Sequence, residues 1–219
     1  MKKNINNVII VAGGAGNRFE NDIPKQFVLL NEIRMIDYSI NTFKNHKNID
    51  NIIIVCHADW LETIKKENPT CIVTEGGKTR KESCYNGLIM CDDEVENILI
   101  HDAARPFVNK RIISECISAL SDYQACSPFI KLNDSVIFKE SNKYKKLDRE
   151  ALFCMQTPQG FKKNILKKIL SVKSNDTDEI GTYLDMYPNN PPYLYEGTKE
   201  NFKVTLKEDI IHAKNCLLK

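Results

Sequence analysis

Short hydrophobic runs of strand length alternate along the chain with segments long enough to form helices. The runs are Asn7–Val11, Asn51–Cys56, Cys71–Thr74, Asn97–His101 and Ala125–Ile130. This alternation is typical of βαβ units. The sequence therefore predicts an α/β fold in which a mostly parallel sheet is flanked by helices.

Two of the intervening segments carry a hydrophobic stripe at helical spacing. The stripes are Met35, Ile36, Ile40 and Phe43 in residues 35–45, and Ile112, Ile113, Cys116, Ile117 and Leu120 in residues 111–123. Both segments are expected to form helices that pack on the sheet. Further helices are predicted at Phe161–Val172, Glu179–Tyr187 and Lys207–Leu218, and a last strand near Phe202–Thr205.

The pattern changes after Ile130, where a polar and lysine-rich stretch is flanked by strand-forming residues. We interpret residues 132–150 as a β-arm that leaves the body of the domain. An isolated two-stranded ribbon is only marginally stable, and the apolar residues Val136–Phe138 would be exposed on it. A partner subunit could cover the arm, but a solvated hairpin fits the sequence equally well.

Length and composition agree with one domain. The chain has 219 residues, of which 42% are hydrophobic, so we assign residues 1–219 to a single domain that carries the arm. Its 31 lysines and arginines nearly balance 29 acidic residues, so neither nucleic acid nor a membrane is an expected partner. The first apolar run is too short for a signal peptide or a membrane span, which indicates a cytoplasmic protein.

The eight cysteines are scattered without a CxxC pair, and several lie in apolar runs. Most of them are therefore expected to be buried free thiols. The four histidines do not cluster with the cysteines at short spacings. A structural zinc site is accordingly not expected.

The first candidate site is the loop after the first strand, where Gly13, Gly14 and Gly16 would let backbone amides approach an anion. The loop lacks the Gly-Lys-Ser/Thr ending of a Walker A motif, and no acidic residue follows the second strand as dinucleotide binding would require. Arg18 and Lys25 add two cations that suit a polyphosphate. Taken alone, both could be ordinary surface charges, but the later motifs favour a site.

The second candidate site is the segment ILIHDAARPF, in which the fourth strand ends near Asp102. An aspartate at the carboxyl end of a parallel strand lies where open α/β sheets bind ligands, and it can hold a Mg²⁺ ion that bridges phosphates. Asp102 could instead cap the next helix. The proximity of Arg105 and Pro106 favours a site, and we interpret His101 as a residue that orients this loop.

Together these segments resemble the ordered motifs of the 2-C-methyl-D-erythritol 4-phosphate cytidylyltransferases. The motifs in this chain are GGAGNRF with PKQF, EGGKTRKES, HDAARPF, LDREALFCMQTPQGF, TDE and ENFKVT. The pattern also resembles the related ribitol-5-phosphate cytidylyltransferases of wall polymers. The resemblance runs from about residue 7 to the end of the chain, and it implies a Rossmann-like nucleotidyltransferase fold.

The resemblance implies roles for residues on the nucleotide side. It makes Arg18, Lys25 and Lys203 the catalytic cations that contact the triphosphate. Nucleotide binding is assigned to Ala12, Gly13, Gly14, Gly16, Gly76, Gly77 and Ser83, the last three of which would select cytosine. Lys78 stands where the family often has an acidic residue, a change that matters little if backbone groups read the base.

The resemblance also implies a metal and an acceptor site. Asp102 matches the aspartate that holds Mg²⁺, while Arg105, Ser135 and Arg149 match residues that grip the phosphate and hydroxyls of the acceptor. Ser135 replaces a more usual threonine and keeps the hydroxyl. Because arm residues in this family reach the site of a neighbouring subunit, the resemblance implies a homodimer formed through the arm.

The implied reaction joins CTP to 2-C-methyl-D-erythritol 4-phosphate and releases pyrophosphate, by positioning and charge stabilisation without a nucleophilic side chain. Ribitol 5-phosphate or another polyol or sugar phosphate remains an alternative acceptor, because residues 178–197 depart from the usual family patterns. A non-catalytic nucleotide-binding protein and a uridylyl- or adenylyltransferase are further alternatives. Pyrophosphate release with different nucleotides would distinguish them.

Overall fold

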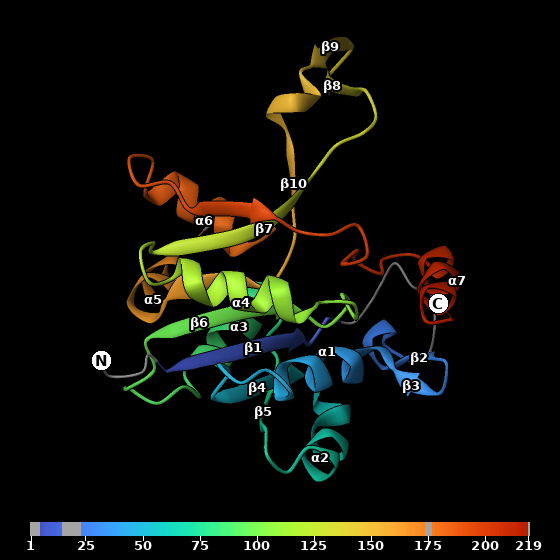
Figure 1. Cartoon of the computed structure of the whole chain (residues 1–219), viewed down its shortest axis with the longest axis vertical. Helices are drawn as coiled ribbons and strands as arrows, with labels where there is room; N and C mark the ends of the chain where they lie inside the picture. Colours follow the sequence, from blue (N-terminus) through green and yellow to red (C-terminus); the bar gives the residue numbers. More distant parts are fainter. Residues whose placement is uncertain (1–4, 15–22, 174–176, 219) are drawn as a thin grey trace.

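The computed structural model describes residues 5–14, 23–173 and 177–218. Its centre is a sheet in the strand order β10-β7-β11-β6-β1-β4-β5, with β12 paired to β7 (Figure 1). The strands are β1 Asn6–Ala12, β4 Asn51–Cys56, β5 Ile72–Glu75, β6 Asn97–Asp102, β7 Ala125–Lys131, β10 Phe153–Met155, β11 Gln159–Lys162 and β12 Tyr193–Glu196. The predicted α/β fold with a mostly parallel sheet is confirmed.

Strand β1 forms the middle of the parallel part of the sheet. It pairs in parallel with β4, with Asn7 opposite Asn51, and with β6, with Asn6 opposite Asn97. Three successive residues of β1, Val8–Ile10, are fully buried. A strand that is apolar on both sides is expected where helices cover both faces of a parallel sheet.

Helices cover both faces of the sheet. One hydrophobic core contains buried residues of α1 Met35–Lys44, α2 Ala58–Glu67 and α4 Lys110–Ala119. The core on the other face contains buried residues of α3 Arg80–Leu88, α5 Lys163–Ser171 and α6 Glu179–Met186. The two predicted amphipathic helices are α1 and α4, and both pack on the sheet through their stripes as expected. They lie on the same face of the sheet.

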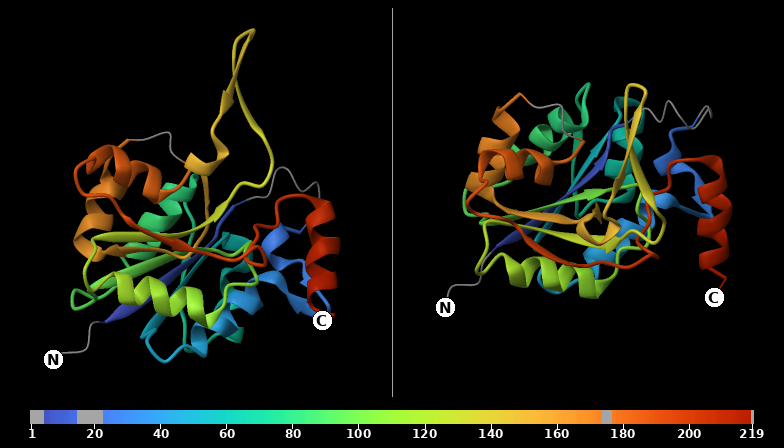
Figure 2. Two further views of the ribbon diagram at one scale, coloured as in Figure 1. Left: turned by 45° about the horizontal axis from the view of Figure 1, so that its top comes forward. Right: turned by 90° about the horizontal axis from the view of Figure 1, so that it is seen from above.

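A smaller layer lies beside the sheet near the C-terminus. It consists of α7 Lys207–Cys216 together with the short strands β2 Leu29–Leu30 and β3 Ile33–Arg34, which follow the 3-10 turn η1 Lys25–Phe27 (Figure 2). Leu30, Met35, Val204 and Ala213 form its own small core. This packing brings the C-terminal segment close to η1, where Lys25 bonds the Val204 carbonyl.

The predicted arm is present as a separate two-stranded sheet. Strands β8 Val136–Glu140 and β9 Lys143–Leu147 pair antiparallel, and they project from the body in Figure 1 and in the left view of Figure 2. The 3-10 turn η2 Arg149–Ala151 follows them. Ile137 and Phe138 are largely exposed on the arm, and so is Tyr144. These exposed apolar side chains lie on the ribbon for which the sequence left two possibilities open. The ribbon is either a solvated hairpin or an arm that a partner subunit covers.

One predicted helix begins later than expected, and one predicted strand was wrong. The segment predicted as a helix from Phe161 begins as strand β11, which pairs antiparallel with β6 and β7, so α5 starts only at Lys163. Residues 202–205 form no strand, because Val204 makes a single backbone bond to Ala104 instead of a ladder. Strands β2, β3, β10 and β12 were missed because they are too short for a periodic pattern.

The cysteines behave as expected, since all eight are free and five of them are buried. Within the described residues, no helix is both long enough and apolar enough to cross a bilayer.

Candidate active site

A cleft of about 950 Å³ opens at the carboxyl ends of β1, β4, β5 and β6. This is the edge at which open α/β sheets bind ligands. The predicted site residues that line the cleft are Ala12, Gly13, Gly14, Lys25, Gly76, Gly77, Ser83, Asp102 and Lys203. Residues far apart in the sequence thus meet around one space. The predicted residues Gly16 and Arg18 lie outside the described part of the chain.

Part of the cleft is lined by glycine main chain, from the loop after β1 and the turn after β5. Gly13 and Gly76 face each other so closely that a Cβ built on Gly13 would lie 3.3 Å from the Gly76 Cα and 3.1 Å from the Ser83 Oγ. The Gly76 amide donates a hydrogen bond of 2.8 Å to the carbonyl of Cys56 at the end of β4. Glycine at both positions therefore lets the two loops pack closely against each other, main chain to main chain.

Ser83 shapes the turn between β5 and α3. Its buried hydroxyl accepts a hydrogen bond of 3.1 Å from the Gly77 amide and donates one of 3.0 Å to the carbonyl of Thr79. The Glu82 carboxylate accepts a 2.6 Å bond from the Lys78 amide, which closes the same turn. Ser83 thus holds the glycine turn predicted to read cytosine.

Asp102 lies at the end of β6 among three cations. Its Oδ1 accepts a hydrogen bond of 3.1 Å from Arg80 Nε, its Oδ2 accepts one of 2.8 Å from Lys203 Nζ, and Arg105 Nε lies 3.8 Å from Oδ2. Burial raises the pKa of the Asp102 carboxyl, but these positive charges outweigh burial and hold the pKa well below its usual range. Asp102 is therefore an anion at neutral pH.

His101 supports the loop behind Asp102. Its buried ring lies 3.0 Å from the Thr157 hydroxyl through Nδ1 and 3.1 Å from the Arg105 carbonyl through Nε2. The same Thr157 hydroxyl accepts a 3.1 Å bond from the Asp102 amide. Burial lowers the pKa of His101 to about 4, so the ring is neutral at pH 7. It orients the loop, as the sequence indicated.

The predicted cations Lys25 and Lys203 approach the cleft from the two ends of the chain. Lys25 Nζ donates a 2.8 Å bond to the carbonyl of Val204, next to Lys203. Gln26 donates from its side-chain amide to the carbonyls of Ala12 and Gly14. The turn η1 is therefore tied both to the glycine loop and to the C-terminal segment.

Comparison with known proteins identifies the family. Residues 6–219 match the family model of 2-C-methyl-D-erythritol 4-phosphate cytidylyltransferase. The chain is 37% identical to the protein of that name from Clostridium kluyveri, over 96% of this chain and 95% of that protein. It is also 37% identical to the one from Clostridium botulinum strain 657, over 98% of each. The chain belongs to this family.

A solved structure agrees with this assignment. The 4-diphosphocytidyl-2C-methyl-D-erythritol synthase from Anaerococcus prevotii superposes with a TM-score of 0.88 at 26% identity, covering 99% of this chain and 97% of that one. The family is one of cytidylyltransferases, so the chain is a nucleotidyltransferase. The resemblance inferred from the motifs, and the nucleotidyltransferase fold that it implied, are confirmed.

The predicted acceptor residues do not line the cleft, although Arg105 lies next to Asp102. Arg105 donates from Nη1 to the Asn201 carbonyl at 2.8 Å and from Nη2 to the Met155 carbonyl at 3.3 Å, so its guanidinium is engaged inside the domain. Ser135 and Arg149 are exposed at the base of the arm, where Arg149 donates to the Asn133 carbonyl. Among the described residues, one copy of the chain therefore brings together those predicted to bind the nucleotide and the metal, but not those of the arm.

Two residues of the site were missed by the sequence analysis. Arg80 bonds Asp102 through Nε and binds both carboxylate oxygens of Glu179 through Nη1, at 2.7 and 2.6 Å. Both belong to motifs that carry the family resemblance, EGGKTRKES and TDE, yet neither follows a pattern that reveals its partner. Only the fold shows that the two motifs meet.

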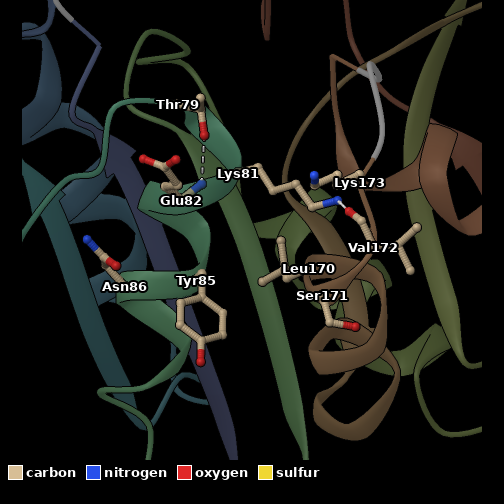
Figure 3. Close-up of a pocket in the computed structure, with 9 residues that line it drawn as sticks. All are labelled: Thr79, Lys81, Glu82, Tyr85, Asn86, Leu170, Ser171, Val172 and Lys173. Carbon is tan, nitrogen blue, oxygen red and sulfur yellow. Dashed lines mark hydrogen bonds between the residues drawn. The ribbon is translucent and has the colours of Figure 1, made fainter.

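A second hollow of about 800 Å³ lies behind the glycine turn, between α3 and the end of α5 (Figure 3). Thr79 and Glu82 line both this groove and the cleft. Lys81 spans the groove and donates to the Val172 carbonyl, while Tyr85 and Leu170 form an apolar wall lower down. Asp102 and the cationic residues of the cleft are not part of this groove, so we assign the chemistry to the cleft.

Proposed function

We propose that the protein transfers CMP from CTP to 2-C-methyl-D-erythritol 4-phosphate and releases pyrophosphate. The observation that carries this proposal is that the glycine loop, the glycine turn, Lys25, Lys203 and Asp102 line one cleft in a member of this cytidylyltransferase family. The two Clostridium relatives are named for this activity, and they match nearly the whole chain. This argues against ribitol 5-phosphate as the acceptor and against a non-catalytic nucleotide-binding role.

The reaction follows from charge and geometry. An oxygen of the acceptor phosphate attacks the α-phosphorus of CTP, the bond to the bridging oxygen on the β side breaks, and pyrophosphate leaves with that electron pair. Both substrates are anions, so the repulsion between them must be offset. Lys25 and Lys203 supply positive charge beside the bare glycine backbone, where they would stabilise the charge that grows on the leaving phosphates.

The donor set of the cleft fits a magnesium ion held jointly with substrate. Mg²⁺ is usually bound by one or two carboxylates, with substrate phosphates and water completing its shell. Asp102 is an ionised carboxylate in the cleft, and the described residues contain no group of three or more acidic, histidine or cysteine ligands that would form a closed metal cage. Bound there, Mg²⁺ would neutralise phosphate charge and orient the triphosphate.

We further propose that the enzyme is a cytoplasmic homodimer whose arm completes the acceptor site of the neighbouring copy. Two observations support this. Ser135 and Arg149 are exposed on the arm rather than in the cleft, and Ile137, Phe138 and Tyr144 expose apolar surface on the same arm. A second copy would both cover this surface and receive the acceptor-binding residues.

The proposal is tested by measuring pyrophosphate release with Mg²⁺ and CTP against a panel of acceptors. We expect release with 2-C-methyl-D-erythritol 4-phosphate, and much slower release with ribitol 5-phosphate or when UTP or ATP replaces CTP. If ribitol 5-phosphate is the one acceptor in the panel that supports pyrophosphate release, the enzyme is a ribitol-5-phosphate cytidylyltransferase instead. Binding of CTP without pyrophosphate release from any acceptor would instead indicate a non-catalytic protein.

A further inference from the structure

Glu179 is a second buried carboxylate near Asp102, the residue assigned to the metal, and Arg80 lies between the two. Glu179 is the first residue of α6 and its side chain is only 4% exposed. Both of its oxygens accept hydrogen bonds from Arg80 Nη1. Because burying a carboxylate is costly unless it is paired, Glu179 and Arg80 depend on each other.

The start of α6 is fixed to the central sheet, which sets the position of Glu179. Asp178 caps α6 by accepting a 3.0 Å bond from the Gly181 amide, and it also accepts a 2.9 Å bond from the side chain of Gln159 in β11. The side-chain oxygen Oε1 of Gln159 in turn accepts a hydrogen bond of 3.3 Å from the Ile180 amide. Gln159 is 1% exposed, so this anchor lies inside the domain.

Arg80 connects this anchor to Asp102. Its Nη1 faces Glu179 while its Nε donates to Asp102 Oδ1, so one guanidinium is shared by two carboxylates. Asp102 also faces Lys203 and Arg105, which makes three cations around it. A divalent cation at Asp102 must compete with these charges, and each of them weakens its binding.

We propose that Glu179 is a positioning residue that holds Arg80 in place and offsets its charge, so that the charge of Asp102 remains available to a divalent metal. The inference rests on the proposed function, since it concerns the metal site of that reaction. Without Glu179, the Arg80 guanidinium is free to turn both of its donor edges to Asp102 and occupy the oxygens that a metal would use. Residues behind a metal ligand commonly change metal affinity about 10- to 100-fold.

The experiment measures metal binding directly rather than turnover. Mn²⁺ serves as the paramagnetic probe, and the electron paramagnetic resonance signal of free Mn²⁺ is titrated against the whole protein with saturating CTP. The variants are Glu179→Gln, which keeps the size of the side chain but removes its charge, and Asp185→Asn, which removes an exposed charge from the same helix as a matched control. We expect Mn²⁺ to bind about 10-fold more weakly to E179Q, and with unchanged affinity to D185N.

A conservative variant separates positioning from folding. Glu179→Asp keeps the charge but is shorter by one methylene, so it is expected to bind Mn²⁺ with an affinity between those of wild type and E179Q, and it gives the decisive comparison with wild type should E179Q not fold. Wild-type affinity for Mn²⁺ in E179Q would overturn the inference, even if the melting temperature of the variant is lowered. If E179Q does not fold, wild-type affinity in E179D would overturn it. Failure of the wild-type protein to bind Mn²⁺ with CTP would contradict the proposed function itself.

Discussion

At the residue scale, the site is organised around the charge of Asp102. A buried carboxylate that faces three cations is stabilised in its ionised form, and those cations are in turn fixed by it. Lys203 is the most exposed of the three, with 39% of its side chain accessible. Lys203 is therefore the cation that can turn from Asp102 towards a triphosphate with the least loss of packing.

Replacement of Lys203 tests its assigned role. Lys203→Ala removes a positive charge that would act on the leaving phosphates, so we expect kcat to fall by about 100-fold or more. Lys25→Ala should have an effect of the same order, because Lys25 contributes the same kind of charge. Steady-state kinetics with Lys199→Ala, a nearby exposed lysine, provides the control. Near-normal turnover in both K25A and K203A would remove these residues from the catalytic set.

His101 makes the stability of the protein depend on pH. Burial lowers its pKa to about 4, whereas an unfolded histidine titrates near about 6.5. Between these values the unfolded state binds a proton that the folded state does not, so stability is full above the unfolded pKa and is lost as the pH falls. From pH 7 to pH 5 the free energy of unfolding should fall by about 2 kcal/mol because of this residue.

Urea unfolding at pH 7 and pH 5 measures this effect. His101→Asn has no titrating ring and should lose the contribution of His101 to the pH dependence. His46→Gln should retain the contribution of His101. Burial also lowers the pKa of His46, so His46 contributes in the same direction. Equal pH dependence in wild type and H101N would show that His101 is not the buried neutral group described above.

At the scale of elements, the turn between β5 and α3 carries the backbone that is predicted to read the nucleotide. Gly77 lies against Glu82 so closely that an added Cβ would be 2.2 Å from the Glu82 Cβ. Gly77→Ala must therefore displace the turn at the cleft. We expect the KM for CTP to rise about 10-fold or more, because the amides of the turn would no longer face the base. An unchanged KM would show that these amides do not contact the nucleotide.

The sequence predicted the elements that have strong periodicity. Strand β4 was predicted with its exact bounds, and the stripes of α1 and α4 matched the core, because buried faces impose a regular spacing. The antiparallel strand β11 was missed because Phe161, which lies in this strand, was assigned to the helix that follows it. Gly160 is needed there because a Cβ would lie 2.6 Å from Cys116 Sγ, a constraint that only packing reveals.

At the scale of the whole molecule, the residues of the proposed active site are divided between the cleft and the arm. The cleft residues and the arm residues were assigned by the same motif resemblance, yet only the cleft residues meet within one chain. The pairing of Arg80 with Glu179 could not be predicted either, because it joins segments that lie 99 residues apart in the sequence. Sequence motifs give the residue types of a site, but contacts across the sheet depend on topology.

Subunit complementation tests whether the arm serves a neighbouring copy. Lys203→Ala inactivates a cleft and Arg149→Ala inactivates an arm, so each homodimer should be nearly inactive. Mixed dimers of the two would contain one intact cleft beside one intact arm, and an equal mixture should recover about a quarter of wild-type activity. The mixture is made by co-expression with two different tags. No recovery in the purified mixed dimer would place the arm and the cleft of one site in the same chain.

The most direct test of the central claim is the identity of the product, determined by ³¹P nuclear magnetic resonance of a mixture of the protein, Mg²⁺, CTP and 2-C-methyl-D-erythritol 4-phosphate. We expect the phosphomonoester signal of the acceptor to disappear while signals of an asymmetric diphosphate and of free pyrophosphate appear together. A spectrum in which the acceptor phosphomonoester persists and CTP is unchanged, or is only hydrolysed, would contradict it.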